Sequence, residues 1–300
     1  MTASRREGLV LSLGMMALIA AIGLQVDRDR RFPRAAQESD QVLYVRSGAA
    51  LKRLTLGFNG IAADVYWIRA LQHYGGDRLI KIPGAVRYQL LYPLLDITTT
   101  LDPHFNIAYR FGAIFLSEGY PGGPGRPDRA IELLRKGLVA MPHKWQYYHD
   151  IGFVYYWHLR DYKASAEWFQ RAEEQPGAPS WLKPLAATML VQGQDRASAR
   201  LLWEQIARSE EEWLRKSATR ALLQLDVLDQ IDQVNAAIRR VPLSPGERYS
   251  WEMLARRGLL RGIPADPTGV LFVLDPDTGR VTVSRDSTLY PLPDEPKRLQ

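Results

Sequence analysis

The chain has 300 residues, of which 46% are hydrophobic and 24% charged, and its formal net charge is +6. This composition is typical of one or two folded domains and excludes a disordered chain. Cysteine is absent, which excludes disulfides, thiolate-held iron–sulfur clusters, covalently attached haem and thiol nucleophiles.

The first predicted element is an apolar segment near the N-terminus. Leu9 to Val26 contains no charged side chain, and this length just reaches that needed to cross a hydrocarbon core. Because the charged run 27–31 resembles a stop at the membrane interface, we predict an uncleaved transmembrane anchor. A cleaved signal peptide, with a small-residue site at 21–23, is the alternative. The short tail favours export of the rest, although the arginines at 28–34 favour the opposite orientation.

Charge is concentrated in the same region. Residues 1–35 carry six arginines against three acids, a net +3, and the rest of the chain is close to balanced. There is no stripe of lysine and arginine with interleaved aromatics, so we expect contact with anionic lipid head groups and no nucleic-acid binding.

Turn signals then divide the chain into five parts. We expect a tail at 1–8, the anchor at 9–26, a linker at 27–50, a helical body at 51–242 and a C-terminal part at 243–300. The body begins with a helical turn at 51–56 and with apolar-periodic helices at 61–74 and 86–100, separated by Gly75-Gly76 and Pro83-Gly84. It ends with helices at 181–191, 197–209, 211–226 and 227–240.

A repeat occupies the middle of the body. Pro142 and Pro176 are 34 residues apart, as are Ala130 and Ala164. The small and large residues of the two units can be read in register, and we predict that they form the buried stripes of paired helices. In the first unit they are Ala108, Phe111, Gly112, Phe115, Ala130, Leu134 and Gly137, and in the second Tyr148, Ile151, Gly152, Tyr155, Ala164 and Trp168.

Two departures interrupt this pattern. Arg171 stands where a small residue is expected, which predicts looser or exposed packing there. The glycine- and proline-rich run Gly119–Pro127 adds six residues to the first unit and is predicted to be an enlarged turn. It lacks the Lys-Ser/Thr of a phosphate-binding loop.

The C-terminal part has a different pattern. Ser244 and Glu247 resemble a capping box opening a helix to Leu260. The runs 269–274 and 280–284 flank an Asp/Pro/Gly turn and predict a β-hairpin, with Gly279 at positive φ. A turn is favoured over a calcium loop, because a third oxygen ligand and a distal glutamate are missing. An isolated hairpin is marginal in water, so this one should dock on the helices or pair with a partner's sheet.

The repeat unit resembles the tetratricopeptide repeat, and the whole chain resembles bacterial membrane-anchored proteins that carry it. The resemblance implies a mainly α fold, an α-solenoid of helix pairs behind one transmembrane helix, with the small hairpin at the C-terminus. It implies a single-pass protein of the inner membrane with a periplasmic repeat domain.

The same resemblance implies a non-enzymatic scaffold or adaptor that binds protein partners and helps assemble a pilus, secretion or similar envelope complex. A permanent structural subunit of a membrane complex is the alternative. In this family the first helix of each pair lines a concave groove. Carried onto this chain, the groove residues are Asn106, Tyr109, Arg110, Ala113, Gln146, His149, Asp150, Phe153, Tyr156 and Trp157.

Catalytic, cofactor and metal sites are not expected. The five histidines do not show the spacing of a helical metal pair, and no serine-hydrolase elbow, dinucleotide fingerprint or zinc-protease motif occurs. We therefore expect a protein that binds proteins and needs no cofactor.

Overall fold

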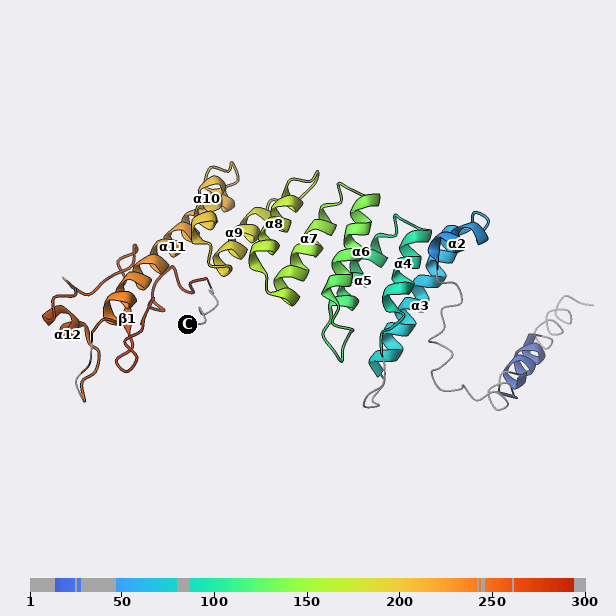
Figure 1. Cartoon of the computed structure of the whole chain (residues 1–300), viewed down its shortest axis with the longest axis horizontal. Helices are drawn as coiled ribbons and strands as arrows, with labels where there is room; N and C mark the ends of the chain where they lie inside the picture. The colour runs from blue at the N-terminus through green and yellow to red at the C-terminus, as the bar shows by residue number, and fades with distance from the viewer. Residues whose placement is uncertain are drawn as a thin grey trace, which may run out of the picture. The chain divides into compact units, whose positions relative to one another are not determined.

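A computed structural model describes residues 14–24, 26–27, 47–79, 87–241, 243, 246–260 and 262–293. These residues are mainly helical, with a small two-stranded sheet near the C-terminus (Figure 1). The chain divides into two compact units, Met1–Asp102 and Pro103–Gln300. The division falls inside the region 51–242 that the sequence predicts as one helical body.

The predicted anchor is only partly described. Residues 14–24 and 26–27 are helical, whereas residues 9–13 and 25 of the anchor lie outside the described residues. Within the described part of the chain, no helix is both long enough and apolar enough to span a membrane. The anchor stays a prediction.

The first unit contains α2 (Gly48–Leu54), α3 (Asn59–Leu79) and α4 (Leu91–Leu101). Ser47 caps α2, because its hydroxyl accepts a hydrogen bond from the amide of Ala50 at 3.2 Å. Gly48 lies against α4, where a Cβ atom would be 2.8 Å from Thr100. The core of this unit lies between α3 and α4 and is built from alanine, leucine and isoleucine side chains with Tyr66.

Two predicted boundaries in this unit are wrong. Helix α3 continues through Gly75 and Gly76 to Leu79, because each glycine costs a helix only about 1 kcal/mol and packing on α4 offsets it. Buried Asp77, one residue later, accepts a hydrogen bond from the amide of Tyr88 and ties the end of α3 to the next segment. Tyr88 has a φ of 64°, so α4 begins at Leu91 and not at Val86.

The second unit begins with helices packed on their neighbours in chain order (Figure 1). They are α5 (Asn106–Ser117), α6 (Pro127–Ala140), α7 (Trp145–Val154), the π-helix η2 (Tyr155–Leu159), α8 (Tyr162–Glu173), α9 (Leu182–Gln192), α10 (Arg196–Ile206) and α11 (Glu212–Ile238). Asp161 and Asp195 cap α8 and α10 by accepting amide hydrogen bonds at 3.0 Å. The run 119–126 connects α5 to α6 as the predicted turn.

Buried residues show that the spacing between second helices is 35 residues, one more than predicted. In α6 they are Ala130, Ile131, Leu133, Leu134 and Gly137, and in α8 they are Ser165, Ala166, Trp168, Phe169 and Ala172. Each residue of the first set is 35 positions before its counterpart in the second. The buried residues of the first unit's second helix were predicted correctly. In the second unit Trp168 is buried as predicted, but the buried set as a whole is displaced by one residue.

The π-helix η2 gives the physical reason for this displacement. A π-turn holds one more residue than an α-turn, so every position after η2 moves by one. Ala164 is therefore only half-buried, and Ala172 takes the small buried position expected at Arg171. Arg171 is exposed, and its guanidinium lies 4.8 Å from the ring centre of Trp168.

The first helices of the pairs match the prediction in part, because the predicted Ala108 and Gly112 of α5 and Ile151 and Gly152 of α7 are buried. In α5 the buried residues include Tyr109 and Ala113, while Phe111 is 50% exposed. In α7 the buried residues are Tyr147, Ile151, Gly152 and Val154, and the predicted Tyr148 and Tyr155 are half-buried.

The C-terminal part packs on the second half of α11. Strands β1 (Val273–Leu274) and β2 (Val281–Thr282) pair antiparallel, with Val273 opposite Thr282 and Leu274 opposite Val281. The amide of Val281 donates to the side chain of Asn235 on α11 at 2.9 Å, so the predicted docking of the hairpin on a helix is confirmed. Gly279 has the predicted positive φ, at 68°.

The helix predicted over 244–260 is much shorter. Helix α12 spans Trp251–Arg256 and is capped by Ser250, whose hydroxyl accepts from the amide of Met253 at 3.1 Å. Ser244 lies outside the described residues. Glu247 pairs with Arg257 at 2.8 Å and is not part of a capping box.

Candidate functional site

An aromatic stripe runs along one side of α7 and η2. It consists of Trp145, His149, Phe153 and Trp157, four residues apart, a spacing that places side chains one above the other on a helix. Phe153 is 41% and Trp157 51% exposed. Their rings are almost parallel, at 7°, with centroids 6.2 Å apart. We call these four residues the α7 stripe.

The N-terminal end of the stripe is more enclosed. The ring of His149 lies 6.2 Å from Trp145, 5.5 Å from Phe169 of α8 and 5.6 Å from Trp181, which precedes α9. Trp181 is itself 42% exposed. The stripe therefore continues onto a second exposed indole, contributed by a different helix pair.

An ion pair fixes α5 against α7 beside the stripe. The guanidinium of Arg110 donates two hydrogen bonds to Asp150, from Nε at 2.5 Å and from Nη2 at 3.1 Å. The hydrogen bond with Asp150 raises the pKa of Arg110 above its ordinary value, against the opposing effect of burial. Asp150 also lies 3.0 Å from Nδ1 of His149. Bidentate pairing of this kind sets geometry as well as charge, so the polar edge of the stripe is pre-organised.

The C-terminal end of the stripe carries a cation and a half-buried imidazole. Arg160 comes directly after η2 with a φ of 55°, and its guanidinium lies 5.3 Å from the ring centre of Trp157. Burial lowers the pKa of the half-buried His158 imidazole below its ordinary value. The exposed end of the stripe thus combines the aromatic ring of Trp157 with the positive charge of Arg160 beside it.

The predicted groove residues divide by position into those at or beside the stripe, those elsewhere that are half-buried, and two that are buried. Arg110, His149, Asp150, Phe153 and Trp157 lie together at or beside the stripe, while Asn106, Gln146 and Tyr156 are half-buried. Tyr156 packs on the core formed by α8, α9 and α10.

The prediction that Tyr109 and Ala113 line the groove is wrong, because both residues are buried. The ring of Tyr109 is inaccessible to solvent and lies 5.4 Å from Tyr147 and close to Gly137. The buried face of α5 includes these two residues together with Ala108 and Gly112, and Phe111 lies outside it.

Trp145 and Trp181 were missed by the sequence reasoning. The four-residue spacing of Trp145 from His149 was visible in the sequence and could have identified the stripe. Trp181 had no such signal, because only the packing of α7 against α8 and the start of α9 brings it to His149.

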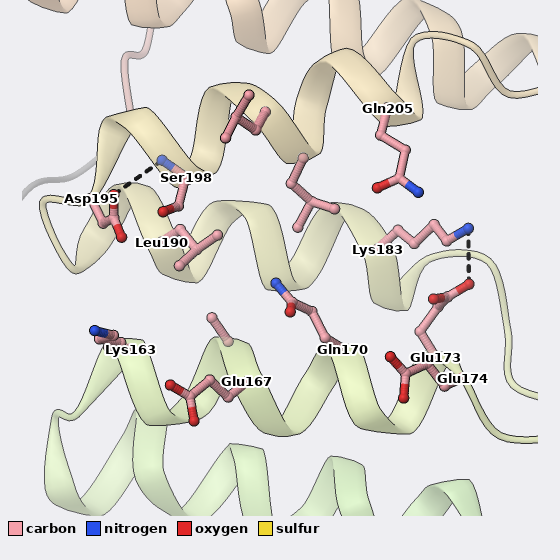
Figure 2. Close-up of a pocket in the computed structure, with 13 residues that line it drawn as sticks. Lys163, Glu167, Gln170, Glu173, Glu174, Lys183, Leu190, Asp195, Ser198 and Gln205 are labelled. Atoms are coloured by element: carbon pink, nitrogen blue, oxygen red, sulfur yellow. Dashed lines mark hydrogen bonds and ion pairs between the residues drawn. The ribbon is translucent and has the colours of Figure 1, made fainter.

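A polar hollow lies over α8, α9 and α10 (Figure 2). It has a volume of about 550 Å³, and mostly polar side chains project toward it, among them Lys163, Glu167, Gln170, Glu173, Lys183 and Gln205. Lys183 and Glu173 form an ion pair at 2.9 Å. Asp195, at the edge of the hollow, caps α10, and the hydrogen bonds from Ser198 lower its pKa. Lys183, Glu173 and Asp195 thus have partners within the protein.

The described residues contain no evident metal-binding cluster. Among them, no group of three histidine, aspartate or glutamate side chains is placed to hold a metal ion. The α7 stripe contains two large exposed aromatic side chains, Phe153 and Trp157.

Comparison with known protein families, characterised proteins and solved structures finds no significant match to this chain.

Proposed function

We propose that this chain is a membrane-anchored protein-binding scaffold, built as an α-solenoid of tetratricopeptide-type helix pairs. Support for the repeat comes from the constant 35-residue offset between the buried residues of α6 and α8. The pairs are α5–α6, α7–α8 and α9–α10, each packed on the next. Helix pairs stacked in this way present extended surfaces and have no need of a catalytic cleft.

The observation that carries the binding role is the exposed half of the α7 stripe. Phe153 and Trp157 are large aromatic side chains that leave 41% and 51% of their surface open to solvent. Tryptophan and arginine are the side chains most enriched at the energetic centres of protein interfaces. Trp157 with Arg160 beside it, and Arg110 fixed by Asp150, give the stripe the mixed apolar and charged character of such a centre.

The partner is a protein segment that lays apolar side chains on these rings. The envelope setting and the inner-membrane location rest on the resemblance of the N-terminal segment and of the repeat to membrane-anchored bacterial proteins. In this function the anchor keeps the stripe close to other membrane components, which raises their effective concentration.

The test compares two matched double variants of the full-length tagged protein. Phe153→Ala with Trp157→Ala removes the exposed half of the stripe, and Leu201→Ala with Trp213→Ala removes similarly exposed side chains from α10 and α11. Proteins cross-linked to each variant in native membranes are quantified by mass spectrometry. An interface centre is worth about 2 kcal/mol or more per residue, so the stripe variant should lose over tenfold of its main partner.

Circular dichroism and melting curves serve as the folding control for both variants. Equal capture by the stripe variant and the unchanged chain would refute the stripe as the binding surface. If a partner stays bound in fixed stoichiometry through detergent extraction and the chain is insoluble without it, the protein is a permanent subunit and not an adaptor.

A further inference from the structure

The turn between α2 and α3 exposes several large apolar side chains at one place. Leu54 is 68%, Leu56 86% and Phe58 68% exposed, and Ile61 on the first turn of α3 is 64% exposed. Neighbouring apolar side chains exposed to this extent mark a contact surface in a folded protein. We call Leu54–Ile61 the apolar turn.

The backbone holds this turn in a defined conformation. Leu56 has a φ of 49° and Gly57 a φ of 96°, and the left-handed region is uncommon for leucine. The amide of Thr55 donates to the carbonyl of Leu51 at 3.0 Å, and that of Phe58 donates to Thr55 at 2.9 Å. The hydroxyl of Thr55 is hydrogen-bonded to the side chain of Asn59. These polar groups are satisfied inside the turn, which lowers the cost of moving it into an apolar medium.

From Ser47 to Ala63 the charged side chains are all basic. Lys52 and Arg53, in the last turn of α2, are exposed and directly precede the apolar side chains. No acidic residue occurs from Ser47 to Ala63, and the first one is the exposed Asp64. Basic side chains beside exposed leucine and phenylalanine are the combination that binds the interface of an anionic bilayer.

The proposed anchor, on which this inference rests, keeps the turn near a membrane. The predicted anchor ends at Val26 and α2 begins at Gly48. A chain of about 20 residues spans at most about 70 Å, so a chain held by the anchor cannot carry the turn far from the bilayer surface. Tethering at this range raises the effective concentration of the lipid surface at the turn.

We propose that the apolar turn inserts into the interfacial layer of an anionic phospholipid bilayer. Leu54, Leu56 and Phe58 enter the boundary of the acyl chains, and Lys52 and Arg53 lie at the phosphates. This contact gives the first unit a second attachment to the membrane besides the anchor. It is independent of the α7 stripe and of any protein partner.

The chain contains no cysteine, so a single introduced cysteine can be labelled specifically. This allows a direct test of the proposal. The full-length Leu56→Cys variant carries an environment-sensitive fluorophore and is reconstituted into vesicles of phosphatidylcholine and phosphatidylglycerol. Some of the lipids carry a quencher on the acyl chain. The matched control is Val139→Cys, because Val139 is 87% exposed and lies on α6.

The label at position 56 should shift to shorter emission wavelength and be quenched by the lipid, whereas the label at position 139 should do neither. Adding Lys52→Gln and Arg53→Gln, or omitting phosphatidylglycerol, should reduce the quenching at position 56. Circular dichroism verifies that each labelled variant keeps its helices.

Three results would overturn the proposal. Position 56 could remain unquenched in vesicles that contain the protein, or position 139 could be quenched equally. The emission at position 56 could also be shifted before vesicles are added, which would show that another protein surface, such as a second copy, covers the turn. None of these results bears on capture by the α7 stripe, since the vesicles contain no partner and Phe153 and Trp157 are unchanged.

Discussion

At the residue scale, Gly152 shows how closely α7 and α8 approach each other. A Cβ atom at this position would lie 2.7 Å from Cδ1 and from Cε1 of Phe169, a ring that is 1% exposed. The sequence places Gly152 and Ala164 in the buried stripes of the second unit, but Ala164 is only half-buried. The structure places Phe169 of α8 against Gly152, five positions after Ala164.

Gly152→Ala should therefore destabilise the second unit. Overpacking of this kind costs about 1–3 kcal/mol, which corresponds to a fall in Tm of about 2–10 °C for a unit of this size. The measurement is thermal unfolding followed by circular dichroism. Gly119→Ala is the matched control, because a Cβ atom there has no heavy atom within 4 Å and should leave Tm nearly unchanged. Equal Tm values for both variants would contradict this close packing of α7 on α8.

At the element scale, α3 was predicted to be shorter than it is. The periodicity of residues 61–74 predicts the helix correctly, but not its continuation past Gly75-Gly76, because the hydrogen bond between Asp77 and Tyr88 forms only in the folded unit. The same limitation explains α12, for which a capping box was predicted and Ser250 is the cap. Helices were therefore predictable from periodicity, and their ends depended on tertiary partners.

Gly76→Ala should stabilise α3. Glycine is about 1 kcal/mol less favourable than alanine in a helix interior, and a Cβ atom at this position would have no neighbour within 4 Å. Hydrogen exchange of the amides in the last turn of α3 should slow by up to about fivefold. Gly60→Ala, at the first turn and equally open, should leave the exchange at the far end unchanged. Faster exchange in Gly76→Ala would show that the backbone at this point is not helical.

On the scale of the whole molecule, the repeat could be predicted from the sequence because its pattern recurs. The residues that form the exposed surface could not be predicted in the same way. Tyr109 was assigned to the groove and is buried, because the buried face of α5 is wider than the predicted stripe and includes Tyr109 and Ala113 beside Ala108 and Gly112. The α8–α10 hollow has no sequence signal, since three helices contribute to it. The apolar turn was likewise predicted only as a helical turn over 51–56.

The C-terminal part depends on polar contacts more than its short strands suggest. Asp266 is 4% exposed and accepts hydrogen bonds from Ser287, from Thr268 at 2.8 Å and from the amide of Val270 at 3.0 Å. Burial alone would raise the pKa of Asp266, but these hydrogen bonds more than offset it and lower the pKa. One carboxylate thus joins the segment 264–270 to the segment after β2.

Asp266→Asn should make the free energy of unfolding of the second unit less dependent on pH in the acid range. The lowered pKa in the folded state means that the carboxylate contributes stability above about pH 4, the pKa of an unfolded aspartate, and that this contribution is lost as the pH falls through the folded value. The variant should lose about 1–3 kcal/mol at neutral pH, and its difference from the unchanged chain should shrink below about pH 4. Asp286→Asn removes the same charge from an exposed position and should change neither quantity appreciably. Urea unfolding across this pH range measures both variants. A difference that stays constant down to pH 2 would show that Asp266 acts through its shape and not through its charge.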